Sequence, residues 1–192
     1  MSNSVKTFAP KSRNDWRNWL KKNHKKEDSV WLLYYKKKTN VTSLTWDDAV
    51  EEALCFGWID SKRQPLDDEK FRQFFGKRKS TGTWSRINKN RVEKLIEAGL
   101  MAKAGLEVIE KAKENGSWSI LDDVEELKTP DDLAKAFRKV KGSKKYFDSL
   151  TRSRKRLLLQ WLVLAKREET RQKRINEIAV SAGKAQMPRQ FQ

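Results

Sequence analysis

Hydrophobic positions near the start of the chain follow the spacing of an amphipathic helix. Trp16, Trp19 and Leu20 fall at i, i+3 and i+4, so a helix over residues 13–23 would bury one face. Ser12 stands just before this stretch and suits an N-cap, because its hydroxyl can accept a hydrogen bond from a free backbone N–H. The pattern therefore predicts an N-terminal helix that packs through its tryptophans.

The next stretch has the composition of a strand and then returns to a helical pattern. Residues 29–38 (SVWLLYYKKK) are β-branched and aromatic at their centre, which predicts a strand with a basic end. Thr45 predicts the cap of a second helix, whose buried stripe includes Val50 and Leu54. Gly57 ends this helix, since glycine tolerates the left-handed backbone that often follows a helix.

Two more strands and two more helices are expected in the N-terminal part. Residues 58–63 and 71–79 predict the strands, and residues 64–68 (QPLDD) predict the turn between them. Helices are expected over residues 85–98 and 102–115. The fold class predicted from this order is α+β, with a small antiparallel sheet and flanking helices followed by a helical C-terminal part.

Beyond Trp118 the pattern is helical only. Helices are expected over residues 130–139, 143–149, 153–165 and 168–181, the third of them capped by Thr151 or Ser153. We expect residues 1–118 to form an α/β part and residues 119–192 to form a basic, all-helical part packed on it. The tail, residues 184–192, is expected to fray.

The net charge of the chain points to the kind of partner that it could bind. Across 192 residues the net charge is +17 and the pI is about 10.0, so the protein should attract nucleic acid, anionic lipid head groups or acidic protein surfaces. The charge is uneven: residues 138–189 carry 16 Lys or Arg against four acids, and residues 107–132 carry nine acids against three Lys. The eight tryptophans and eight phenylalanines argue against disorder.

Cysteine and histidine usage limits the chemistry. The single cysteine, Cys55, excludes an internal disulfide and fits a reducing compartment. With His24 as the one histidine, no His/Cys zinc site can form, so we expect no metal and no cofactor. The N-terminal segment has no apolar leader, and the apolar run at residues 157–165 is far below the roughly 20 residues of a membrane span. A cytoplasmic protein without a membrane span is expected.

Several segments carry a family resemblance. They are WRNWLKKNH (16–24), VWLLYYKK (30–37), AVEEALCFGWIDS (49–61), TWSRIN (83–88), GLMAKAGLEVIEKAKENGSW (99–118) and AKREETRQKRI (165–175). Together they resemble the YdeI/OmpD-associated proteins, also labelled bacteriocin-protection proteins. The resemblance implies a role in stress response, as tolerance of bacteriocins or cationic peptides, and it implies no agreed reaction. The family's prolines before the Trp-Ser pair are absent here, so the loop is expected to be more flexible.

A first candidate site lies on the second predicted strand. In a regular strand Trp58, Asp60 and Lys62 would share one face, and Arg63 would lie on the other. An acid beside tryptophan and lysine could form the wall of a binding pocket. The alternative is a surface ion pair, which contributes roughly 0–1 kcal/mol.

A second cluster lies just before and at the start of the helix expected over residues 85–98. It combines basic residues with a tryptophan, and the free N–H groups of a helix start attract anions. Combined with the first cluster it gives the candidate ligand-binding set, which is Trp58, Asp60, Lys62, Arg63, Arg78, Trp84, Ser85 and Asn88. The expected ligand is an anionic small molecule, through a phosphate or carboxylate group. The alternative for the second cluster is a solvated loop.

The basic C-terminal helices supply a candidate polyanion-binding set. It consists of Arg152, Arg154, Lys155, Arg156, Lys166, Arg171 and Arg174. Either this face is free for an acidic or polyanionic partner such as nucleic acid, or it pairs with the acidic segment at residues 122–126 inside the fold. Nucleic-acid binding would weaken steeply with salt.

The sequence therefore predicts a non-enzymatic cytoplasmic binding protein for an anionic ligand. Two alternatives stay open. One is a nucleic-acid-binding module that uses the basic C-terminal helices. The other is an enzyme of unknown reaction with Asp60 as acid or base, and it requires a perturbed carboxylate in a concave pocket.

Overall fold

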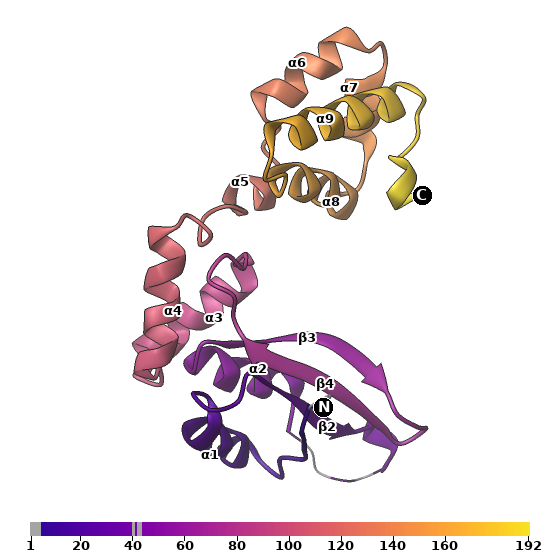
Figure 1. The fold of residues 1–192 in the computed structure, drawn as a ribbon. Coiled ribbons are helices and arrows are strands. Elements are labelled where there is room, and N and C mark those ends of the chain that lie inside the picture. Colours follow the sequence, from indigo (N-terminus) through magenta and orange to yellow (C-terminus); the bar gives the residue numbers. More distant parts are fainter. Residues whose placement is uncertain (1–4, 40, 42–43) are drawn as a thin grey trace, which may run out of the picture. The chain divides into compact units, whose positions relative to one another are not determined.

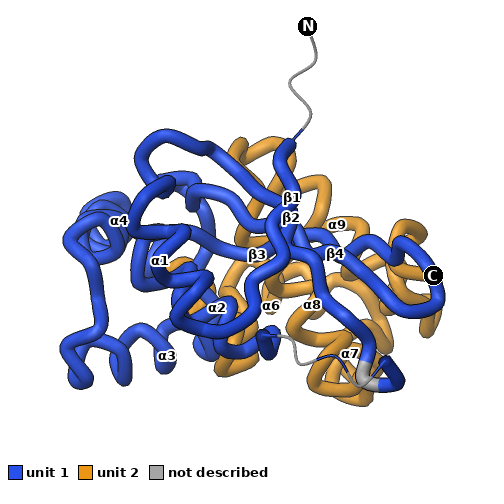
Figure 2. Tube along the Cα trace, turned by 90° about the horizontal axis from the view of Figure 1, so that it is seen from below, with its two compact units in different colours: residues 1–118 blue, residues 119–192 orange. Residues whose placement is uncertain are grey.

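A computed structural model describes residues 5–39, 41 and 44–192, and residues 1–4, 40, 42 and 43 lie outside the described part. The chain divides into two compact units, residues 1–118 (unit 1) and residues 119–192 (unit 2) (Figure 2). None of the described helices combines the length and the apolar content that a membrane crossing needs.

Unit 1 is built on a four-stranded open sheet of order β1-β2-β4-β3 (Figure 1). The strands are β1 (Thr7–Phe8), β2 (Ser29–Tyr35), β3 (Trp58–Pro65) and β4 (Lys70–Lys77). The predicted α+β class and the antiparallel pairing of β2, β4 and β3 are confirmed. The short strand β1 was not expected, and it pairs parallel to β2. Two residues are too few to show a strand pattern.

The described residues of unit 1 also form four α-helices and one 3₁₀ turn. They are α1 (Arg13–Asn23), η1 (Lys37–Thr39), α2 (Trp46–Cys55), α3 (Arg86–Glu97) and α4 (Lys103–Glu114). The predicted caps Ser12 and Thr45 are confirmed, since they accept hydrogen bonds from the backbone N–H groups of Asp15 and Asp48. Ser85, which was expected inside the helix, caps α3 in the same way and accepts from the backbone N–H of Asn88. Capping side chains satisfy N–H groups that the first helical turn leaves free.

Aromatic residues join α1 to the inner face of the sheet. The Trp16 ring lies 5.6 Å from the Phe75 ring, and the Trp19 ring lies 5.9 Å from the Trp58 ring. Trp16, Phe75 and Trp58 have no solvent exposure. Buried aromatic rings of this size dominate the stability of a core, so unit 1 has a well-packed centre beside the site described below.

A bulge in β3 corrects the predicted alternation of its faces. Asp60 pairs with Phe75 and Arg63 pairs with Gln73, so three steps along β3 oppose two along β4. The extra residue turns every later side chain to the opposite face. Arg63 therefore shares the inner face with Asp60, and its guanidinium lies 3.7 Å from the centre of the Phe71 ring.

Lys62 lies on the outer face of the sheet instead of beside Trp58. Its amine is 5.7 Å from the rings of both Trp31 and Phe74, which alternate with the inward-facing residues of their strands. Arg72 covers Trp31 as well, at 4.3 Å from the ring centre. The cations on this face are thus packed on aromatic rings, an arrangement that stabilises both partners.

Unit 2 contains helices only. They are α5 (Asp122–Glu125), α6 (Asp131–Lys139), α7 (Ser143–Ser149), α8 (Arg152–Val163) and α9 (Glu168–Gly183), followed by η2 (Arg189–Phe191). Their core includes Leu133, Leu158, Leu162 and Ile178, which are at most 2% exposed.

The C-terminal tail differs from the expected frayed segment. Met187 is buried, and the Phe191 ring lies 5.5 Å from the Trp161 ring in an edge-to-face contact. The amide of Gln192 also donates to the Met187 carbonyl oxygen over 2.9 Å. Apolar side chains of the tail thus pack against the helices. The polar and charged residues around them gave no sign of this packing in the sequence.

Candidate functional site

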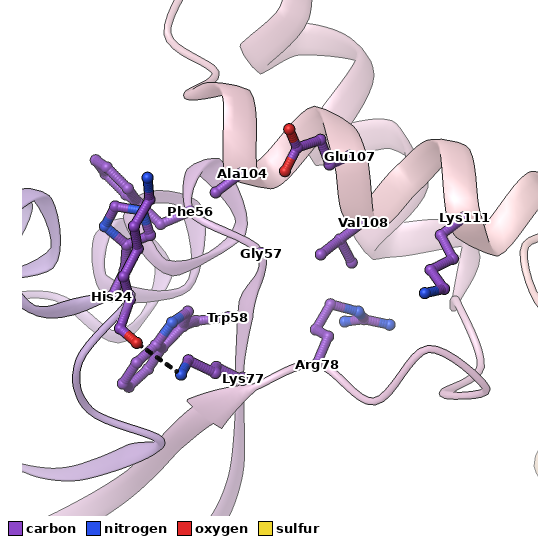
Figure 3. A pocket seen from close by; sticks show the side chains of 11 residues that line it. His24, Phe56, Gly57, Trp58, Lys77, Arg78, Ala104, Glu107, Val108 and Lys111 are labelled. Carbon is purple, nitrogen blue, oxygen red and sulfur yellow. Dashed lines mark hydrogen bonds between the residues drawn. The ribbon is translucent and has the colours of Figure 1, made fainter.

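A pocket of about 490 Å³ lies in unit 1 between the C-terminal end of α1 and α4 (Figure 3). Its lining comes from His24 and Lys25 after α1, from Phe56, Gly57 and Trp58 between α2 and β3, from Lys77 and Arg78 at the end of β4, and from Ala104, Glu107, Val108 and Lys111 on α4. Segments far apart in the sequence therefore meet here. Volumes of this size are typical of sites for small organic ligands.

Gly57 allows α4 to approach the end of α2 closely enough to form one wall. Its φ is +73°, a conformation that glycine adopts without strain. A Cβ atom at this position would lie 2.8 Å from Cγ2 of Val108 and 3.1 Å from the Ala104 carbonyl oxygen. The glycine predicted as a helix stop thus has a second role, as the contact point for α4.

Arg78 is the most unusual side chain of the pocket. Its guanidinium stacks 3.6 Å above the Trp84 ring, and Nη2 donates to the Thr83 carbonyl oxygen over 2.7 Å. Its Nε is buried and has no hydrogen-bond partner. No carboxylate among the described residues lies within ion-pair distance of Arg78. The pocket wall therefore contains a cation without a counter-charge.

Burial lowers the pKa of Arg78 to about 10, and the negative charge of Asp60 opposes this shift only in part. A lowered pKa means that the folded state disfavours the charged form. The charged guanidinium therefore reduces stability at all pH values below about 10, and stability rises as the pH increases through that value. A bound anion would compensate this unfavourable charge.

The remaining charged groups make the pocket positive. Lys77 is partly neutralised, since its amine lies 2.8 Å from Asp28 and donates to the Lys25 carbonyl oxygen over 3.1 Å. Lys111 is exposed and has no ion pair within the described part of the chain. Glu107 is the one acid of the lining, and it lies 3.8 Å from Lys103.

Trp58 contributes a second unsatisfied donor. Its indole Nε1 is buried without a hydrogen-bond partner, although the ring itself lines the pocket. The third such atom among the described residues is Tyr34 Oη, away from the pocket, where burial raises the pKa. Buried donors are satisfied in most proteins, so unsatisfied ones call for an explanation. Two of the three belong to side chains that line one pocket.

The structure places the predicted ligand-binding residues in different surroundings. Trp58 and Arg78 line the pocket, and Trp84 lies behind Arg78. Asp60 does not line it: its Oδ2 accepts hydrogen bonds from Trp46 Nε1 at 3.0 Å and Gln73 Nε2 at 3.1 Å. These bonds give Asp60 a structural role within the sheet.

The other four residues of the set lie outside the pocket lining. Lys62 and Arg63 pack on aromatic rings on opposite faces of the sheet. Ser85 caps α3, and Asn88 supplies the backbone N–H that Ser85 accepts. The loop between Arg78 and Ser85 lacks prolines, but its Ser80 carbonyl oxygen accepts hydrogen bonds from Asn115 at 2.8 Å and Ser117 at 3.2 Å.

Sequence reasoning missed the contributions of α1 and α4. His24 was expected only as a helix end, and it does cap α1, with its ring Nδ1 2.8 Å from the Leu20 carbonyl oxygen. Lys111 belongs to a charged helix face with no local signal. The spacing of Ala104, Val108 and Lys111 on one helical face was visible, but nothing local shows which segment that face covers.

Unit 2 partly neutralises the candidate polyanion-binding set. Arg152 donates to the Glu125 carbonyl oxygen over 2.6 Å, and Arg156 lies 3.1 Å from the Glu125 carboxylate. The acidic segment at residues 122–126 therefore pairs with two members of the set. Arg154 and Lys155 have no ion pair within the described part of the chain.

Of the members of this set on or near α9, two are bonded to other groups of unit 2 and one is exposed. Arg171 lies 2.6 Å from Asp132, and although partial burial opposes it, this contact lowers the pKa of Asp132 below its ordinary value. Arg174 donates to the Trp161 carbonyl oxygen and lies 4.9 Å from its ring centre. Lys166 is exposed. Four of the seven side chains are thus held by groups of unit 2 itself.

Among the described residues, no three His, Cys, Asp or Glu side chains lie close enough together to hold a metal ion. Cys55 is buried, and burial raises the pKa of its thiol, an effect that the nearby Arg17 opposes only in part. A buried thiol with a raised pKa is unreactive, so it behaves as a small core residue.

Comparisons with known families divide the chain in two. A family model described as "Domain of unknown function (DUF8412)" matches residues 8–108, which include nearly all of the pocket lining. A model described as "Bacteriocin-protection, YdeI or OmpD-Associated" matches residues 126–184. No curated protein matches the chain. No solved structure matches it either.

These matches limit the resemblance drawn from the sequence. The segment AKREETRQKRI (165–175) lies in the YdeI/OmpD-associated match, but the signature ALCFGWID (53–60) lies in the other one. The similarity to YdeI/OmpD-associated proteins is therefore shown for the C-terminal part alone. Because residues 8–108 make up more than half of the 192 residues, the chain belongs to the family described as a domain of unknown function (DUF8412).

Proposed function

We propose that this protein is a non-enzymatic binding protein that holds an anionic small molecule in the pocket between the end of α1 and α4. The observation that carries the proposal is Arg78, a guanidinium in the pocket wall with an unsatisfied Nε and no carboxylate partner among the described residues. An anion that accepts a charge-assisted hydrogen bond from Arg78 would satisfy a donor and neutralise the charge together.

The surroundings of Arg78 support the same ligand class. Trp84 stacks against the guanidinium and restricts its motion, so little side-chain entropy would be lost on binding. Lys111 adds a positive charge from α4. The net charge of +17 would also increase the rate at which anions reach the pocket.

We expect Arg78→Met to remove anion binding without unfolding the protein. Methionine keeps an apolar contact with Trp84 and removes the uncompensated charge, so the free energy of unfolding should change by no more than about 1 kcal/mol. The dissociation constants of phosphate, sulfate and benzoate should each rise at least about tenfold. Chemical-shift titration of the Trp58 indole N–H measures the affinity, because Trp58 lines the pocket.

Lys22→Gln is the matched control for charge. Lys22 is exposed on α1 and lies outside the pocket lining, so the variant loses one positive charge and should bind as the wild type does. Urea titration of each variant checks that it is folded. Equal affinity of Arg78→Met and wild type for all three anions would refute the proposal.

The other expectations have less support. Binding of nucleic acid by the C-terminal helices stays a prediction, and the pairing of Arg152, Arg156, Arg171 and Arg174 within unit 2 leaves fewer cations for it. A cytoplasmic location and a role in stress response also stay predictions, the latter on a family match to residues 126–184 alone.

A further inference from the structure

The pocket is larger and more asymmetric than a bare inorganic anion requires. Its volume is about 490 Å³, and a second hollow of about 290 Å³ shares His24, Lys25, Ala104 and Glu107 with it. The two hollows therefore continue into each other along the N-terminal half of α4. Sites in this size range enclose most of the surface of an organic ligand, so the anionic group should carry a body.

Three cations lie at one end of the pocket, and a fourth, Lys25, lines both hollows. Arg78 and Lys111 lie on the same side of the pocket in Figure 3, and Lys77 lies near Arg78 at the end of β4. Asp28 offsets one of these three charges through Lys77. The remaining charge of about +2 matches a phosphate monoester, which carries about −1.5 to −2 at neutral pH, better than it matches a single carboxylate.

The part that the two hollows share contains both an acid and a base, Glu107 and Lys25. Glu107 lies one turn before Lys111 on α4 and lines both hollows, as His24 does. An ionised carboxylate only accepts hydrogen bonds, so it favours a body that presents hydroxyl groups. Val108 supplies apolar surface between Glu107 and Arg78, and Phe56 supplies more beside His24.

We infer that the ligand is a phosphate monoester with a hydroxylated body, such as a sugar or polyol phosphate, held with its phosphate at Arg78 and Lys111 and its hydroxyl groups at Glu107. This inference rests on the proposed function, because it concerns the same pocket. It adds the chemical class of the ligand and the orientation of the ligand in the pocket.

Sorbitol 6-phosphate and hexyl phosphate test this directly, since they share a phosphate and a six-carbon chain and differ in the hydroxyl groups. Titration calorimetry of the 192-residue chain should give sorbitol 6-phosphate an affinity about tenfold higher than that of hexyl phosphate. Lys111→Gln should weaken both ligands by a similar factor, because it changes only the phosphate end. Sorbitol and inorganic phosphate, used alone, should each bind more weakly than sorbitol 6-phosphate.

Glu107→Ala is the decisive variant, and Glu114→Ala is its matched control on the same helix, exposed and outside both hollows. Glu107→Ala should reduce the preference for sorbitol 6-phosphate to within about twofold. The variant loses the carboxylate that accepts hydrogen bonds from the hydroxyl groups, and the apolar chain of hexyl phosphate no longer lies against a negative charge. Glu114→Ala should keep the tenfold preference.

Equal binding of the two phosphates by the wild type, or a preference that survives Glu107→Ala, would overturn the inference. The proposed function would still stand if both phosphates bind and lose affinity in Arg78→Met. Failure of every probe to bind the folded wild type would overturn both proposals.

Discussion

Replacing Glu52 by alanine should reduce the free energy of unfolding of unit 1 by about 3 kcal/mol. Glu52 is 3% exposed and holds two arginines of α1, with Oε1 2.7 Å from Nε of Arg13 and Oε2 2.6 Å from Nη1 of Arg17. Its removal takes from Arg17 the carboxylate that it contacts and leaves Arg13 with the more exposed Asp48 and Glu51. The expected loss is at the lower end for a buried ion pair, because the arginine side chains are 38% and 22% exposed and water can reach them.

Urea unfolding followed by tryptophan fluorescence measures this loss, because every tryptophan except Trp161 lies in unit 1. Glu51→Ala is the matched control: Glu51 contacts the same Arg13 at 3.0 Å, but its side chain is 32% exposed. That variant should lose less than about 1 kcal/mol. Losses of equal size in the two variants would show that burial of the ion pair is not what stabilises the α1–α2 contact.

Gly105→Ala should destabilise unit 1 by about 2 kcal/mol, although alanine is the better helix former. A Cβ atom at Gly105 would lie 2.3 Å from the Cys55 carbonyl oxygen and 2.8 Å from its carbonyl carbon, and backbone atoms cannot move aside as a side chain can. Helix α4 would have to shift away from α2, which breaks the hydrogen bond from Ala102 N–H to the same oxygen, now 3.0 Å. Overpacking of about 3 kcal/mol then exceeds the helix propensity gain of about 1 kcal/mol.

The same urea titration tests this prediction, with Glu114→Ala as the control because it places alanine on the exposed side of α4. The control should change stability by no more than about 0.5 kcal/mol. Gly105→Ala should also weaken phosphate binding, since a shifted α4 moves Lys111 and Val108 away from Arg78. A Gly105→Ala protein as stable as wild type would contradict the close approach of α4 and α2.

Local features of this protein could be read from the sequence because their causes are local. Ser12, Thr45 and Thr151 cap their helices as predicted, since a cap depends on a side chain and an N–H only three residues away. The β-branched and aromatic composition of β2 and the turn between β3 and β4 depend on neighbouring residues in the same way, so the α+β class was predictable.

The site depended on contacts that no local pattern encodes. The bulge after Asp60 moved Lys62 to the outer face, a change that depends on how β3 pairs with β4. Trp58 and Arg78 were chosen from the sequence, but Lys111 joins them only because Gly57 lets α4 pack against the end of α2. Short-range hydrogen bonding and periodicity thus determined the elements, while close packing between distant elements decided which charged side chains share the pocket.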